Sequence, residues 1–379
     1  MNLKWFFSFV FIVFLSAFLT IWNYQKREYG WDMPGYIGSV YKMEFPDSPQ
    51  KVHQLTFQSI KKEASKAEYE KLSGVKPYHK ATQVFEKNAD AFFEQLPYYE
   101  IKVGYNLAVF ILQKVGFSPP MSVLAISLLS YFFSAIFIFF ILRKTIFPDN
   151  WFLTVLIVSG VMLLSPLALM SHAPTPDLFV FLFILILIFG LFSKWKKWLI
   201  FIVLFFITLV RPDYIPFTLT YLITIFLFEY IKNKKIEVAF ILQGVILLGL
   251  YSGIVEYYNY PGWRNLFYDS FIYRRPILSS QQAVFSVKDY LSIAFEKFLN
   301  FKKITLSAII FTFFIFKYSN DLWMRMLTVL FFVNLYIKFF FFPQSGETRF
   351  FFPFLFPLLM IMLFVTSKKY NGFKLNKIP

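Results

Sequence analysis

Long runs of hydrophobic residues alternate with short polar stretches along the whole chain. A helix needs about 20 apolar residues to cross a bilayer. The pattern predicts about ten such helices. They cover residues 5–23, 120–142, 151–170, 177–193, 198–212, 214–231, 236–255, 303–317, 322–341 and 350–366. The pattern therefore predicts an all-α polytopic membrane protein, with residues 1–379 forming a single integral membrane domain.

Two polar stretches, residues 24–119 and 256–302, are too long to be simple connections between helices. The first ends in a segment in which Lys102, Asn106 and Gln113 share one narrow helical stripe and nearly every other residue is apolar. That pattern predicts helices lying in the membrane interface, within a large first loop.

The end of that first loop has an alternative reading as an eleventh span. This reading would move Arg143 and Lys144 to the opposite side of the membrane from the other basic clusters. Basic residues in short loops favour the cytoplasm, so the interfacial reading is preferred.

Clusters of basic residues follow alternate predicted spans and set the orientation. The clusters are Arg143 and Lys144; Lys194, Lys196 and Lys197; Lys232, Lys234 and Lys235; Lys317; and Lys368, Lys369, Lys374 and Lys377. With alternating spans they all lie on one side, the cytoplasm. Both termini are then inside (N-in/C-in), and both long loops are outside. The first apolar run is read as a retained helix in a plasma (inner) membrane.

Composition supports the membrane assignment. Apolar residues make up 58% of the chain and charged residues 16%, and phenylalanine occurs 55 times, which excludes an ordinary soluble domain. The chain has no cysteine, which excludes disulfides and thiolate chemistry. The net charge of +16 lies in short clusters between apolar runs, so we expect membrane lipids and no nucleic acid as partners.

Ionisable residues from four separated parts of the chain fall at helix ends on the outer side. They are Asp32; His172 and Asp177; Arg211 and Asp213; and Glu347 and Arg349. Ionisable groups at membrane depth are costly and commonly functional. The set therefore predicts a site that acts on a lipid-borne substrate.

Each of these residues also has a structural interpretation. Asp32 and Asp177 could cap the helices that follow them. Arg211 and Asp213 could form a local pair around a proline. Arg349 could extend to lipid headgroups, with Glu347 as its partner. The joint occurrence of these residues on one face favours the functional interpretation.

A metal is not required by the sequence. Three histidines without a His-x-x-x-His spacing do not predict zinc around His172. A divalent cation held by Asp32, Asp177 or Glu347 stays an alternative, since hard cations bind carboxylate oxygens.

The order of several short motifs resembles the GT-C superfamily of integral membrane glycosyltransferases. The motifs are the aspartate of Trp31-Asp32-Met33, the apolar segment from Tyr98 to Phe117, Leu142-Arg143-Lys144, Thr175-Pro176-Asp177, Val210-Arg211-Pro212 and Glu347-Thr348-Arg349-Phe350. The layout covers most of the chain. One departure is that Asp32 stands alone where many relatives carry two adjacent acids.

The resemblance implies an enzyme, a hexosyltransferase whose donor is a polyprenyl-phosphate-linked sugar. The acceptor would be a glycan, lipid or protein of the cell envelope, approached from the extracytoplasmic face. Asp32 would be the general base of an inverting displacement. Arg211, Arg349 and Lys102 would stabilise the departing phosphate, and Asp177 would assist acceptor or metal binding.

Other functions remain open at this stage. A polysaccharide polymerase or ligase usually carries its large outside loop late in the chain, whereas here the larger loop comes first. A transporter or flippase of lipid-linked sugars would show charged or broken mid-membrane segments and matching halves. A structural scaffold for envelope assembly would leave the outer acid and arginine residues unexplained.

Overall fold

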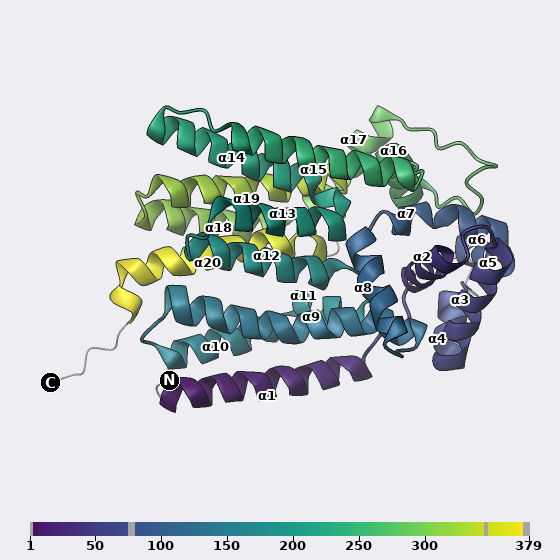
Figure 1. Ribbon diagram of the computed structural model, residues 1–379, viewed down its shortest axis with the longest axis horizontal. Coiled ribbons are helices and arrows are strands. Elements are labelled where there is room, and N and C mark those ends of the chain that lie inside the picture. The colour runs from purple at the N-terminus through teal and green to yellow at the C-terminus, as the bar shows by residue number, and fades with distance from the viewer. Residues whose placement is uncertain (1–2, 75–79, 345–347, 374–379) are drawn as a thin grey trace.

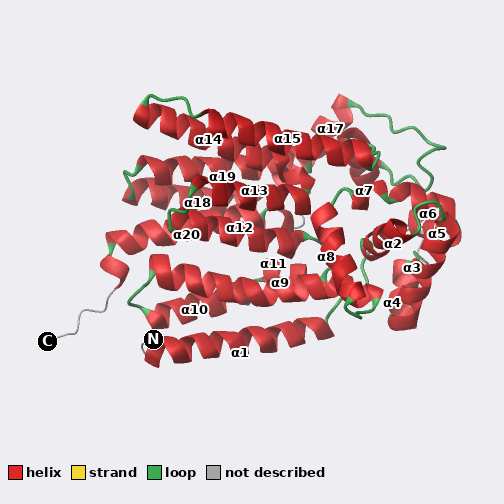
Figure 2. Ribbon diagram, in the orientation of Figure 1, coloured by secondary structure: helices red, strands yellow, loops and turns green. Residues whose placement is uncertain are grey.

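The computed structural model describes residues 3–74, 80–344 and 348–373. Over these residues the chain is all-helical and contains no strand, as Figure 2 shows. Helical turns of the 3-10 or π type, labelled η, extend or join several of the α-helices. The predicted all-α class is confirmed.

The helices follow one another with short connections. The first half contains α1 (Leu3–Gln25), α2 (Met33–Glu44), α3 (Pro49–Glu63), α4 (Lys66–Leu72), α5 (Lys80–Lys87), α6 (Ala89–Gln95), α7 (Pro97–Glu100), α8 (Val103–Lys114), α9 (Pro119–Ile141), η2 (Leu142–Ile146), α10 (Trp151–Met162) and α11 (Ser165–His172). The second half contains α12 (Asp177–Phe192), α13 (Lys197–Val210), η3 (Pro212–Tyr214), α14 (Ile215–Asn233), α15 (Val238–Tyr257), α16 (Trp263–Phe267), η4 (Tyr268–Ile272), α17 (Val287–Leu299), α18 (Lys302–Tyr318), α19 (Leu322–Phe341), η5 (Thr348–Phe350), α20 (Phe352–Lys369) and η6 (Asn371–Phe373).

Among the residues that the structure describes, six helices are long and apolar enough to cross a membrane, or up to eight if each of two bent pairs forms one span. The pairs are α10 with α11, bent by 53°, and α17 with α18, bent by 66°. The sequence predicted about ten spans. The difference lies in α12 and α13, which are apolar but only 16 and 14 residues long. The chain is a polytopic helical membrane protein.

The spanning helices lie side by side, and the helices from α2 to α8 gather at one end of the bundle (Figure 1). The beginning of α1 and the end of α20 lie at the other end. Large apolar side chains on the outer helices face away from the protein; Phe14 of α1 is 71% exposed. Such surfaces require an apolar environment, which a bilayer supplies.

The segment predicted as one interfacial helix from Tyr98 to Phe117 is broken at Ile101 and Lys102, between α7 and α8. Asn106 fixes the break, because its buried side-chain amide donates a hydrogen bond of 3.0 Å to the Tyr99 carbonyl. Helix α8 has 12 residues, is not among the candidate spans, and runs across the ends of the bundle helices (Figure 1).

Segments from the two predicted outside loops pack against each other. The Tyr98 hydroxyl donates a 2.6 Å hydrogen bond to Asp269, and Asp269 forms a 2.8 Å ion pair with Arg275. Glu94 accepts hydrogen bonds from the backbone N–H and the hydroxyl of Ser279. The buried guanidinium of Arg275 is therefore occupied inside the protein.

Candidate functional site

A network of charges lies at the end of the bundle nearest α2 to α8; its members Asp177, Arg211 and Lys338 are buried and Asp213 is exposed at its edge. The guanidinium of Arg211 binds both oxygens of Asp213 at 3.1 Å and also pairs with Asp177. Arg211 ends α13, whose regular structure stops before Pro212, and Asp177 begins α12. The predicted local pair therefore exists, but it is part of a larger network that joins two helix ends.

Lys338 is a further member of this network that the sequence analysis did not name. It lies near the end of α19 and its ammonium group pairs with Asp213. The side chain is 8% exposed, so it requires an anionic partner. The sequence signal that could have identified Lys338 is its place in an otherwise apolar run, because a charged side chain in lipid is costly and commonly functional.

Arg349, in η5, approaches the carboxylate of Asp177. Its Nε atom lies 4.0 Å from an Asp177 oxygen. Because the side chain of Asp177 is only 4% exposed, it holds the two arginines in place and offers little surface to a ligand. Asp177 is the first residue of α12 and not its N-cap, so the capping interpretation is wrong. Glu347 lies outside the described residues.

Asp32 lies outside this network, at the start of α2. It is half-buried and occupies the N-cap position, but its side chain makes no capping hydrogen bond. The Asp32 carboxylate lies close enough to the Tyr99 phenol for its charge to act on that group. Burial and the Asp32 charge raise the pKa of Tyr99, so the phenol keeps its proton.

Lys102 interacts electrostatically with both Asp32 and the charged network. Its Nζ atom donates a 2.8 Å hydrogen bond to the Tyr98 carbonyl and lies 5.4 Å and 5.2 Å from the ring centres of Tyr36 and Tyr99. Its charge interacts with Asp32 on one side and with Arg211, Asp213 and Asp177 on the other. Burial and the Arg211 charge lower the pKa of Lys102 to about 8.

Close backbone packing accounts for the position of Lys102. A Cβ atom on Gly104 would lie 3.1 Å from the backbone nitrogen of Val210. Glycine therefore allows α8 to press against the last turn of α13, one residue before Arg211. The first loop is thereby held against the charged network.

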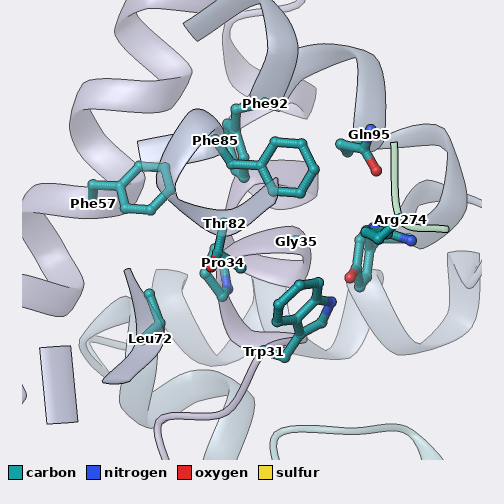
Figure 3. A pocket seen from close by; sticks show the side chains of 11 residues that line it. Trp31, Pro34, Gly35, Phe57, Leu72, Thr82, Phe85, Phe92, Gln95 and Arg274 are labelled. Carbon is teal, nitrogen blue, oxygen red and sulfur yellow. The ribbon is translucent and has the colours of Figure 1, made fainter. Parts of the chain in front are cut away.

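A small cavity of about 30 Å³ is lined by Trp31 and Pro34, which stand on either side of Asp32 and Met33 in the chain (Figure 3). Trp31 and Arg274 line it on one side and Phe57 and Leu72 on another. Two buried polar atoms of its lining, Nε of Arg274 and Oε1 of Gln95, have no hydrogen-bond partner within the described part of the chain. The cavity has room for a water molecule or a hydroxyl group.

His172 faces α1. One of its ring nitrogens lies 3.2 Å from the Asn23 side-chain oxygen, and its carbonyl accepts a hydrogen bond from the Glu28 backbone. These contacts tie the end of α11 to the start of the first loop. They give His172 a structural position at the end of α11.

The described residues contain no group of three or more histidine, aspartate or glutamate side chains that could hold a metal ion. Of the three expected cation ligands, Glu347 is not described, and the carboxylates of Asp32 and Asp177 lie in different surroundings. In the chemistry available here, Asp32 is a carboxylate that can accept a proton, and Lys102 and Arg349 can bind an anion.

No protein-family model, curated protein sequence or solved structure matches this chain.

Proposed function

We propose that the chain is a membrane glycosyltransferase that moves a sugar from a polyprenyl phosphate to an acceptor hydroxyl. The observation that carries the proposal is the position of Lys102. Its charge interacts with Asp32 and also with the charged network around Arg211. A proton acceptor and a group of cations therefore share one site. Glycosyl transfer from a phosphate donor needs both.

In this mechanism the Asp32 carboxylate takes the proton from an acceptor hydroxyl. The acceptor oxygen forms a bond to the anomeric carbon as the bond from that carbon to the phosphate oxygen breaks, which inverts the configuration. The proton moves from Asp32 to water afterwards. A positioned base typically contributes a factor of about 10² to 10⁴ in rate.

Negative charge builds on the departing polyprenyl phosphate. Lys102 and Arg349 are half-buried cations that can meet it. Arg211 is more deeply buried and fully engaged by Asp177 and Asp213, so its role is to fix the geometry of the site. Preorganised cations facing a developing charge are an effective source of catalysis in a site that excludes water.

A hydroxyl group of the acceptor is proposed to enter the cavity lined by Trp31, next to Asp32 in the chain. The unpaired atoms of Arg274 and Gln95 offer one donor and one acceptor to a hydroxyl-bearing ligand. Trp31 adds an aromatic face. These features support a glycan, lipid or protein acceptor that carries hydroxyl groups.

The proposal includes the orientation predicted from the sequence. The site would face outward from a plasma (inner) membrane. The loops 24–119 and 256–302 would be extracytoplasmic, and both ends of the chain would be cytoplasmic. The gathering of α2 to α8 at one end of the bundle supports this arrangement (Figure 1).

The test is transfer by the purified protein in lipid nanodiscs. Radiolabelled hexosyl polyprenyl phosphates and the matching sugar nucleotides are each supplied with glycan, lipid and protein acceptors. We expect label to move from a polyprenyl phosphate donor with inverted anomeric configuration, and not from a nucleotide donor. Transfer from the nucleotide alone, or transfer from none of the donors, would overturn the proposal.

A further inference from the structure

A second hollow, of about 460 Å³, lies at the end of the bundle opposite the charged network. Its walls come from the end of α12, from α13, α14 and α15, and from the start of α19. It extends inward to Leu204 and Tyr221, which are almost fully buried. Its volume lies in the range of about 300 to 1,000 Å³ that is usual for ligand sites.

The walls of this hollow are mainly apolar. They include Leu191, Ile200, Leu204, Leu222, Ile225 and Phe228. Water molecules would find few hydrogen-bond partners in such a space, whereas a hydrocarbon chain needs none. In a membrane protein the available apolar ligand is the acyl chain of a lipid.

Three lysines lie at the mouth of the hollow, together with Trp195 and Trp323. Lys197 is already occupied, with Glu229 at 3.1 Å and Glu237 at 2.7 Å. The remaining two lysines, Lys194 and Lys232, form no ion pair within the described part of the chain. The mouth therefore presents two cations that are available to an anion.

The carboxylates at the mouth are already engaged. Besides Glu229, the lining contains Asp321, which caps α19 by accepting a 2.9 Å hydrogen bond from the Trp323 backbone. Aromatic residues beside lysines are typical of the headgroup level of a bilayer.

The backbone at Lys194 is unusual. Lys194 has φ of +54°, and the turn around it is closed by a 2.9 Å hydrogen bond from the Trp195 N–H to the Gly190 carbonyl. Glycine is the usual residue in this position after a helix because it has no steric penalty there. The turn places Lys194 just after the end of α12, beside the wall formed by Gly190 and Leu191.

We propose that this hollow binds one anionic phospholipid, with an acyl chain between the helices that line it and the phosphate at Lys194 and Lys232. In the orientation proposed above, the lipid belongs to the cytoplasmic leaflet. The inference does not depend on glycosyl transfer, and it assigns to the protein a lipid site separate from the charged network.

The experiment measures lipid retained by the purified full-length protein in native mass spectrometry, and the unfolding temperature Tm in detergent. The probes are phosphatidylglycerol and phosphatidylcholine with identical acyl chains. We expect one phosphatidylglycerol to be retained and to raise Tm, and phosphatidylcholine to do neither. Equal binding of the two lipids, or binding of neither, would overturn the proposal.

Variants locate the lipid. Lys194→Asn with Lys232→Gln removes both free cations, and asparagine suits the positive φ at residue 194. We expect phosphatidylglycerol affinity to fall about ten-fold or more. The matched control, Lys196→Gln with Lys235→Gln, removes the same charge from exposed lysines outside the hollow and keeps the affinity. Equal losses from both pairs would mean attraction by general surface charge and would contradict the site.

A filling variant tests the acyl chain separately. Ile225→Trp places a larger side chain in the hollow and leaves the lysines unchanged. We expect it to abolish retention of phosphatidylglycerol while Tm without lipid stays close to that of the wild type. Retention at the wild-type level in this variant would show that the lipid binds elsewhere.

Discussion

Arg211 illustrates how far single residues can be understood from the sequence. Its pairing with Asp213, two residues away, follows from the sequence alone. Its pairing with Asp177 and the contact of Asp213 with Lys338 bridge 34 and 125 positions, so they depend on how the helices pack. Of the predicted site residues, Lys102 interacts with both Asp32 and this network, whereas His172 contacts α1.

Replacement of Arg211 tests the buried network. Arg211→Met would leave the carboxylate of Asp177, 4% exposed, without its closest cation. Breaking a buried pair in this way costs about 3–5 kcal/mol. We expect a large fall in Tm in detergent. The control Lys297→Met breaks an exposed pair with Glu296 and is expected to cost at most about 1 kcal/mol. Equal Tm values for the two variants would contradict a buried network.

Lys102 predicts a pH dependence. Its pKa is lowered to about 8, so its charge is present below that pH and is lost above it. If the ammonium group meets the donor phosphate, kcat/KM for transfer falls as the pH rises through about 8, because this ratio reports the free enzyme. In Lys102→Arg the guanidinium stays charged. We expect this fall to disappear in the variant; an unchanged profile would exclude Lys102 as its source.

At the scale of the elements, the sequence predicts that helices exist better than it predicts where they break. The apolar periodicity anticipates α9, α19 and α20 closely. It misses the break between α7 and α8, because that break is fixed by a hydrogen bond from Asn106 to the carbonyl of Tyr99. Helix α12 begins directly after Pro176, and α13 stops before Pro212, so prolines bound both short helices at the end that carries the charged network.

Helix α2 depends on glycine for its contact with α7. A Cβ atom on Gly35 would lie 2.5 Å from the Tyr99 ring. Gly35→Ala therefore displaces the Tyr99 ring, and overpacking of this kind costs about 1–3 kcal/mol. We expect a lower Tm and weaker transfer. The control Gly160→Ala in α10 meets no atom within 4 Å, so its Tm should stay the same or rise. A Gly35→Ala protein with wild-type Tm would contradict the tight contact.

At the scale of the whole molecule, the composition predicts the membrane class and the basic clusters predict an orientation. They do not predict that the two long loops pack together. That contact depends on specific pairs such as Tyr98 with Asp269 and Glu94 with Ser279. It places both loops beside the charged network at one end of the bundle (Figure 1).

The orientation is testable because the chain contains no cysteine. Single substitutions Ser280→Cys and Lys235→Cys lie at exposed positions in the second long loop and at the opposite end of the bundle. In spheroplasts, a membrane-impermeant maleimide should label Ser280→Cys at once. Lys235→Cys should react only after the membrane is permeabilised. The reverse pattern would place the site on the cytoplasmic face.

The most direct test of the account is transfer by Asp32→Asn, which keeps the shape of the side chain and removes the base. Its control is Asp47→Asn, at an exposed position beyond the end of α2. We predict that the wild type and Asp47→Asn transfer label from a polyprenyl phosphate sugar. Asp32→Asn should lose activity by about 10²-fold or more while its Tm and donor binding are kept. Equal transfer by all three proteins would show that Asp32 is not the base and would contradict the proposed site.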